Sequence, residues 1–340
     1  MSKCCTTHRG LIRRELRSAK PSVGFSLIEL MIAMLLGLIV IGGVVSVFLA
    51  NQQSYRTNQA LGEVQDGSRT AFEMMAQDIR NAGLIGCDSG GDIANVLANK
   101  GTAWWANWNN AMKGYGSAQA DPAAPSGTGA GQRATGDSLE LIGATNSGLS
   151  VLSDNHTTTL FTLNETSPDL LSGDVMIVCD PGNAAVFQSS SYSSTAKTVG
   201  YDAPAGTPGN SSKILGATGT PYTFGANALI AKLTAVDWYI GNTPGVAGGL
   251  SLYRVRLVNN AGSIATTADE MVRNVTDMSI KYLQSGNASF GAASTITNWG
   301  AVTAVQVQLT LQSTNQNAGT DAKPITRIFT ATTTARNRVN

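Results

Sequence analysis

An apolar run at residues 30–50 constrains this chain more than any other feature, because its 21 residues carry no charge. An α-helix of that length spans roughly 30 Å, which is the thickness of a bilayer's hydrocarbon core. Residues 1–24 hold six Lys or Arg and one acid, Glu15, and so carry a net charge of +5. Basic residues ahead of an apolar segment keep that end in the cytoplasm. The pattern predicts a single-pass membrane helix with the body of the chain outside the cytoplasm.

One carboxylate, Glu29, stands directly before this run. A carboxylate near the end of a spanning helix costs about 1–3 kcal/mol, so it is usually kept for a partner or a function. A secretory signal peptide fits less well, because its apolar core is usually shorter. An anchor helix with an incidental acid is the plain alternative.

The motif "GFSLIE" at residues 24–29 resembles the processing site of type IV pilins and of type II secretion pseudopilins. In those proteins a basic leader ends in Gly, and the mature chain begins with Phe and has Glu at its fifth position. The resemblance implies that a prepilin peptidase cuts between Gly24 and Phe25 and methylates the new amine of Phe25. It also implies that Glu29 of one subunit pairs with the Phe25 amine of its neighbour. Such a pair would set the register of the packed helices, because an unpaired buried charge is costly.

Within that family, residues 20–88 are similar to the minor pilins called PilW, through "QSYR" at 53–56, "DIRNAG" at 78–83 and Cys87. Weaker similarity returns at 270–283 and near the C-terminus. The resemblance implies a minor pilin that helps to initiate or cap a type IV pilus. Its implied partners are the prepilin peptidase, other minor and major pilins, the inner-membrane assembly platform and a tip adhesin. A minor, J-like pseudopilin of a type II secretion system is the alternative, since it would share the leader, the helix and Glu29.

The resemblance and the residue pattern together predict an α+β, pilin-like fold. We expect a leader at 1–24, a membrane-spanning and spine helix at 25–82, and a β-rich periplasmic or extracellular head at 83–340. Apolar residues continue near 3- and 4-residue spacing beyond the membrane run, which predicts one amphipathic face: Leu61, Val64, Ala71, Phe72, Met75 and Ile79. The pair Gly42 and Gly43 is the expected bend, and Gly83 the expected stop. A coiled-coil stalk over 51–81 is the alternative.

The head is expected to consist mainly of strands separated by turn-rich loops. The candidate strands are 138–144, 157–163, 174–179, 229–240, 250–258, 277–283, 302–311 and 325–334. Apolar and polar residues alternate in 302–311, which predicts a half-buried strand. The last two strands are expected to pair antiparallel. Two stretches of low apolar content, 117–136 and 189–212, are expected to be long exposed loops.

Four cysteines occur in the chain, and two of them, Cys4 and Cys5, lie in the leader. The remaining pair, Cys87 and Cys179, predicts a disulfide in an oxidising compartment outside the cytoplasm. Two unpaired buried thiols are the alternative.

Three tryptophans, Trp104, Trp105 and Trp108, fall within ten residues. They predict either a small hydrophobic core beside the spine helix or an exposed surface for a partner. If this segment were α-helical, Trp104 and Trp108 would share one face.

No catalytic, metal or cofactor site is predicted. The chain has two histidines; His8 lies in the leader and His156 in a polar stretch, and the cysteines lack CxxC spacing. Residues 25–340 hold 17 basic and 21 acidic residues, which predicts no nucleic-acid surface. We therefore expect a protein that is not an enzyme. A membrane-anchored periplasmic enzyme or ligand-binding domain is the remaining hypothesis, and it would require a convergent polar pocket.

Overall fold

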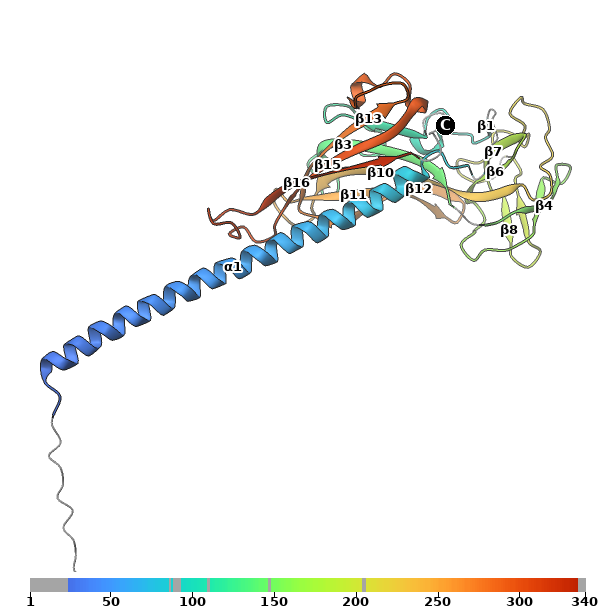
Figure 1. Cartoon of the computed structure of the whole chain (residues 1–340). Coiled ribbons are helices and arrows are strands. Elements are labelled where there is room, and N and C mark those ends of the chain that lie inside the picture. The colour runs from blue at the N-terminus through green and yellow to red at the C-terminus, as the bar shows by residue number, and fades with distance from the viewer. Residues whose placement is uncertain are drawn as a thin grey trace, which may run out of the picture. The chain divides into compact units, whose positions relative to one another are not determined.

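A computed structural model describes residues 24–85, 87, 93–108, 111–145, 148–203 and 206–335 of this chain. It contains one long helix, α1 (Leu27–Asn81), followed by a β-rich head (Figure 1). The chain divides into two compact units, residues 1–55 and 56–340, so the second half of α1 belongs to the same unit as the head. The coarse expectation of an α+β chain with a long N-terminal helix is confirmed. The predicted leader, except for Gly24, lies outside the described residues.

Helix α1 begins two residues later than the predicted 25 and ends one residue before the predicted 82. The helix runs without interruption through Gly42 and Gly43. At its C-terminal end, Gly83 has φ +74°, a left-handed conformation that glycine adopts without strain and that commonly ends helices. The chain then turns directly onto the head, where the Gly83 N–H donates to the Ile142 carbonyl at 2.8 Å.

The head contains sixteen strands among its described residues. They are β1 (Ile93–Asn95), β2 (Met112–Tyr115), β3 (Arg133–Ala144), β4 (Val151–Asn155), β5 (Leu160–Leu163), β6 (Val175–Asp180), β7 (Asn183–Gln188), β8 (Ser191–Ser193), β9 (Thr198–Gly200), β10 (Leu229–Asn242), β11 (Leu250–Asn260), β12 (Ser263–Arg273), β13 (Val275–Gln284), β14 (Gly291–Ala292), β15 (Val302–Gln312) and β16 (Thr326–Thr334). Short 3₁₀ helices also occur, at Trp104–Ala106, Ala293–Thr295 and Trp299–Ala301.

These strands form three sheets. The largest has the order β1-β7-β6-β10-β11-β12, and β3 joins it by pairing with β10 and with β2. Strand β10 links the two parts of this sheet, because Leu229–Lys232 pair with β6 and the residues from Leu233 onward pair with β3. The other sheets have the orders β14-β13-β15-β16 and β4-β5-β9-β8. Apart from the parallel pair β1–β7, the named strand pairs are antiparallel.

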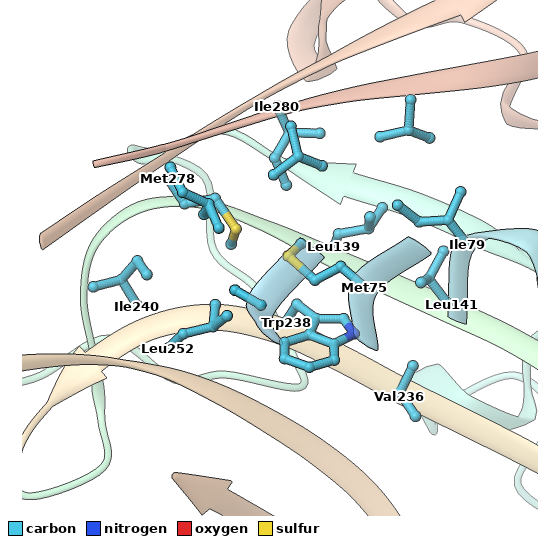
Figure 2. Packing of buried hydrophobic residues seen from close by; sticks show 14 of the residues in the cluster. Met75, Ile79, Leu139, Leu141, Val236, Trp238, Ile240, Leu252, Met278 and Ile280 are labelled. Carbon is cyan, nitrogen blue, oxygen red and sulfur yellow. The ribbon is translucent and has the colours of Figure 1, made fainter. Parts of the chain in front are cut away.

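The central core lies between the second half of α1, the large sheet and the β13–β15 sheet (Figure 2). Helix residues Val64, Ala71, Met75 and Ile79 are buried there, and Met75 lies near Trp238 of β10. The facing sheet contributes Val305, Val307, Leu309 and Leu311 from β15. Burial of one helical stripe of this kind stabilises the helix more than its intrinsic propensity does. The second half of α1 is therefore part of the head's core, and the coiled-coil alternative does not describe its packing.

A second core lies beneath the β4-β5-β9-β8 sheet and is rich in aromatic side chains. Phe161 is at its centre, with ring centroids 4.7 Å from Tyr201, 5.7 Å from Phe187 and 5.9 Å from Phe224. These tilted and edge-on arrangements are the favourable ones for aromatic pairs.

The predicted strands all correspond to strands of the structure, with ends shifted by several residues. Strands β15 and β16 pair antiparallel as predicted. The expectation of two exposed loops is wrong in part, because 117–136 includes the start of β3 and 189–212 includes β8 and β9. Asp121, Ala124 and Arg133 in the first stretch are also buried. Low apolar content was misleading there, because backbone pairing and buried polar contacts order both stretches.

The predicted helical face is also shifted slightly. Leu61 and Phe72 are only partly buried, whereas Ala60 and Ser68 are buried. Small residues at these positions let the helix approach the head closely. For example, the Thr57 hydroxyl donates to the Ala318 carbonyl at 2.6 Å, and Ala60 packs with Ala318 and Ile325.

Candidate functional site

The predicted processing site lies at the start of α1. Gly24, Phe25 and Ser26 are exposed and precede the first helical residue, Leu27. The Ser26 hydroxyl accepts a hydrogen bond from the Glu29 N–H at 3.2 Å, which is the geometry of an N-cap. The Gly24–Phe25 peptide bond is therefore outside the helix and accessible in the chain.

Glu29 is exposed and lies in the first turn of α1. A carboxylate in that position interacts favourably with the positive end of the helix dipole, by typically 0.3–1 kcal/mol. This local interaction provides a structural role for Glu29 besides the assembly role that the family resemblance implies.

Helix α1 is long and apolar enough to cross a membrane. Side chains in residues 27–50 are exposed on all faces of the helix, which is typical of a segment that faces lipid or other helices. Among the described residues it is the one helix with these properties.

The second half of α1 is attached to the head through Asp78, the first residue of the "DIRNAG" motif. Its carboxylate accepts hydrogen bonds from Trp238 Nε1 at 2.9 Å and from Arg254 Nε and Nη2 at 2.8 and 3.0 Å. The Arg254 guanidinium also lies 5.8 Å from the centre of the Trp238 ring. Bidentate contacts between arginine and a carboxylate are among the stronger polar interactions in proteins. From the sequence, this motif indicated only a resemblance to minor pilins, and no role was predicted for Asp78.

Close backbone approach at the end of α1 is the second element of this attachment. Ala82 forms an isolated β-bridge with Gly143 of β3. A Cβ atom at Gly143 would lie 2.2 Å from the Asn81 carbonyl oxygen, so only glycine fits at this position. The helix end and the central strand thus meet at a contact that any side chain would obstruct.

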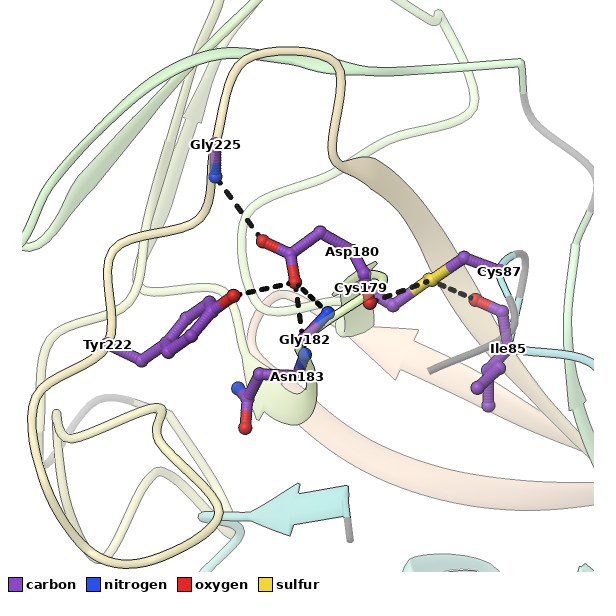
Figure 3. Close-up of a disulfide and its surroundings, with 8 residues drawn as sticks. All are labelled: Ile85, Cys87, Cys179, Asp180, Gly182, Asn183, Tyr222 and Gly225. Carbon is purple, nitrogen blue, oxygen red and sulfur yellow. Dashed lines mark hydrogen bonds between the residues drawn. A yellow bond between two sulfur atoms is a disulfide. The ribbon is translucent and has the colours of Figure 1, made fainter. Parts of the chain in front are cut away.

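The two cysteines of the head, Cys87 and Cys179, form a disulfide, as the sequence predicted (Figure 3). Their Cα atoms lie 6.1 Å apart, and 92 positions separate them along the chain. The bond joins the segment that follows α1 to strand β6. Next to it, Asp180 orders the β6–β7 turn by accepting hydrogen bonds from the N–H groups of Gly182 and Asn183 and from the Tyr222 hydroxyl.

The three predicted tryptophans lie on a 3₁₀ turn and the residues that follow it, and not on an α-helix. Trp105 is buried, and Trp104 and Trp108 are half-buried against the same hydrophobic cluster. Their main contacts are therefore with the interior, in agreement with a core role. The residues of this cluster come from the head and none from α1, so it is not the core beside the spine helix that was predicted. Trp108 also lines an open groove on the surface.

A buried carboxyl cluster, which sequence reasoning missed, lies on the large sheet. It comprises Asp121, Glu140 and Asp237, and Asp237 of β10 is directly opposite Glu140 of β3. Both carboxyl oxygens of Asp237 and Oε1 of Glu140 are buried without a hydrogen-bond partner. The nearby Arg133 guanidinium instead donates to the carbonyl oxygens of Gln119, Gly116 and Gly136.

Burial is the main cause of the altered acidity in this cluster. It raises the pKa of Glu140 to about 8, and the charge of Asp121 adds to that effect. Burial also raises the pKa of Asp237 well above its usual range, with further contributions from Asp121 and Glu140. The hydrogen bond that the Tyr115 hydroxyl donates to Glu140, and then the Lys113 charge, oppose the rise in the pKa of Glu140; Arg133 opposes the rise at Asp237. Glu140 and Asp237 thus retain protons near neutral pH. The sequence carries no clear signal for this cluster, because alternation in "SLELIGA" places Glu140 on the strand face opposite Leu139 and Leu141.

The residues available for catalysis are few. His156 is exposed, and its Nδ1 lies 3.0 Å from the Thr223 hydroxyl. Within the described part of the chain, no group of three or more His, Cys, Asp or Glu side chains is arranged to hold a metal ion.

Comparisons with protein-family models, with curated proteins and with solved structures find no match to this chain. Functional interpretation therefore depends on the residues and their arrangement.

Proposed function

We propose that this chain is a minor pilin of a type IV pilus, which a prepilin peptidase cuts between Gly24 and Phe25. The observation that carries the proposal is the two-part character of α1. Its first half is apolar and exposed on all faces after an accessible Gly24–Phe25 bond, and one face of its second half is buried against the head. A subunit that moves from a membrane into a fibre needs both halves in one helix.

Attachment of the head to the helix supports the proposal. The Asp78 contacts, the Gly143 approach and the disulfide all act between the end of α1 and the strands that follow. A pilus bears tension, and a head joined to its helix at several points would transmit that tension without unfolding. The disulfide also favours a periplasmic and then extracellular location for the head.

Assembly, and not catalysis, is the mechanism in this proposal. After cleavage, the helix remains in the inner membrane until its lipid contacts are replaced by contacts with neighbouring helices. Glu29 would then pair with the Phe25 amine of an adjacent subunit. Two opposite charges 4 Å apart at an effective dielectric constant of 20 attract by about 4 kcal/mol, so a subunit out of register would lose that energy.

Intact-mass and N-terminal analysis of the protein recovered from membranes and from sheared surface fibres tests the proposal. We expect a chain that begins at N-methylated Phe25 and that is present in the fibre fraction. A chain that retains residues 1–24 in cells with an active prepilin peptidase would refute processing. A processed chain found only beside secretion pseudopilins would support the type II secretion alternative.

Substitution of Glu29 tests the assembly step separately. We expect Glu29→Ala and Glu29→Gln to enter the membrane and to be cleaved normally, yet to reach sheared fibres in much smaller amounts. Exposed Glu63, in the second half of α1, provides the matched control as Glu63→Gln. Normal incorporation of both Glu29 variants into fibres would contradict the pairing role.

A further inference from the structure

An open groove of about 540 Å³ lies on the head beside strand β1, at the edge of the large sheet. One wall is formed by β1 and by Asn107 and Trp108, which follow the 3₁₀ turn at Trp104–Ala106. The opposite wall is formed by the segment 211–219. Volumes of this size are typical of sites for small ligands.

Hydrogen bonds from asparagine side chains hold both walls in place. Asn95 Nδ2 donates to the Ala106 carbonyl at 2.6 Å, which ties β1 to the tryptophan turn. On the other side, buried Asn183 donates to the Leu215 carbonyl at 2.7 Å and accepts from the Ala217 N–H at 3.0 Å. The groove is therefore preformed, and a ligand would not have to order the walls on binding.

A second set of contacts fixes the end of the outer wall. Ser211 donates from both its N–H and its hydroxyl to the Val96 carbonyl, at 2.7 and 3.0 Å. Lys100 Nζ donates to the Asn95 carbonyl at 2.9 Å within the first wall. The two walls are thus joined to the same short segment, residues 95–96.

The chemistry of the lining is neutral and mixed. Lys100 is the one charged side chain among the described lining residues, and its ammonium already has a protein acceptor. The amide of Asn95 is already paired at both ends, with the Ala106 carbonyl and the Leu97 N–H. The remaining polar groups of the lining are the amide of Asn107 and the hydroxyls of Ser211 and Ser212, beside the partly exposed indole of Trp108. An indole offers a flat apolar face to the C–H groups of a sugar ring. Amides and hydroxyls both donate to and accept from sugar hydroxyls.

We propose that this groove binds a neutral saccharide, which stacks on Trp108 and forms hydrogen bonds with the amide and hydroxyl groups of the two walls. A polyanion would need several cations, and the described lining supplies one. On a surface-exposed head, such a site would attach the protein to a polysaccharide. The inference does not require the pilus proposal, because an anchored head with the same groove would bind in the same way.

Binding is to be measured with the full chain in lipid nanodiscs, because sugar-based detergents would compete for the groove. The probes are cellobiose, maltose, lactose and N,N′-diacetylchitobiose. Their binding is detected by saturation-transfer NMR and by tryptophan fluorescence. Concentrations should reach about 10 mM, since a Kd of 1 mM corresponds to only about 4 kcal/mol. We expect at least one disaccharide to bind with a Kd in the millimolar range or below.

Three variants locate the site. Ala217 is exposed on the groove wall, so Ala217→Tyr fills the groove without removing a side-chain contact and should weaken binding at least about tenfold. Ala196 is exposed in the turn between β8 and β9, and Ala196→Tyr is the matched control that should bind normally. Trp108→Ala should abolish binding. Trp108→Phe, which keeps an aromatic ring, should retain part of the affinity.

The outcomes separate clearly. Lack of binding by all four disaccharides would overturn the proposal, as would equal binding by the Ala217→Tyr variant and the parent chain. Competition of the saccharide signal by short anionic or peptide ligands, with higher affinity than any sugar, would assign the groove to another ligand class and also overturn it. The mass analysis of the N-terminus is independent of all these results.

Discussion

Removal of the Asp78 carboxylate should loosen the attachment of α1 to the head. In Asp78→Ala, the buried Trp238 N–H loses its acceptor, and an unpaired buried donor costs about 1–3 kcal/mol. Arg254 also loses a bidentate partner. Because 27% of the Arg254 side chain and 15% of the Asp78 side chain are exposed, that loss is about 1–2 kcal/mol, below the value for a fully buried pair.

These two losses predict that Asp78→Ala lowers the free energy of unfolding of the head by about 3 kcal/mol. For a unit of this size, the midpoint of thermal unfolding should fall by about 5 °C. The assay is thermal and denaturant unfolding of the full chain in mild detergent, followed by near-UV circular dichroism. Asp78→Asn retains an acceptor for Trp238 and should cost about half as much.

A matched control and a double-mutant cycle decide the cause. Exposed Asp66 lies on the same helix, and Asp66→Ala should change stability by less than about 0.5 kcal/mol. If Arg254 and Asp78 act together, Arg254→Ala combined with Asp78→Ala should cost less than the two single losses added, by about 1 kcal/mol. A stability of Asp78→Ala equal to that of the Asp66→Ala control would refute the reasoning.

Three further predictions concern the head. The pKa of Glu140 is raised to about 8 from an ordinary value near 4.5, so between these pH values the folded state binds more protons than the unfolded state. The free energy of unfolding should therefore fall as the pH rises from 5 to 8. Glu140→Gln should flatten that pH dependence in denaturant titrations. Reduction of the disulfide should increase protease cleavage of the head, since the chain-entropy model assigns about 4–5 kcal/mol of stabilisation to a bond that closes a loop of this length. A Cys87→Ser, Cys179→Ser double variant should be cleaved equally with and without reductant. Gly143→Ala should lower the free energy of unfolding by about 3 kcal/mol, because its new methyl group meets the backbone carbonyl at the end of α1. In the same unfolding assay, Gly62→Ala should stabilise the helix slightly, because its methyl group meets nothing within 4 Å.

Local features of the sequence predicted much of the fold. The charge-free run and the apolar spacing after it predicted α1, because helical periodicity and membrane length are properties of neighbouring residues. Alternation in 302–311 predicted β15 and its buried face for the same reason. The disulfide was predictable from cysteine number alone, since only two cysteines follow the leader.

Short strands and buried polar contacts were not predictable from such local patterns. Strands β8 and β9 lie in a stretch of Ser, Thr and Gly, and they exist because β5 offers one of them a partner. Asp78 resembled any helix acid in the sequence. Its role depends on Trp238 and Arg254, which follow it by 160 and 176 positions.

The sequence by itself determined the long helix, its apolar first half and the longer strands, because these depend on the pattern of apolar residues over short distances. Only the tertiary structure decided how the helix is attached to the head, which acids are buried together and where the groove beside Trp108 lies. Those features arise where segments far apart in the chain meet. The energy of such contacts depends on burial and geometry, which neighbouring residues do not encode.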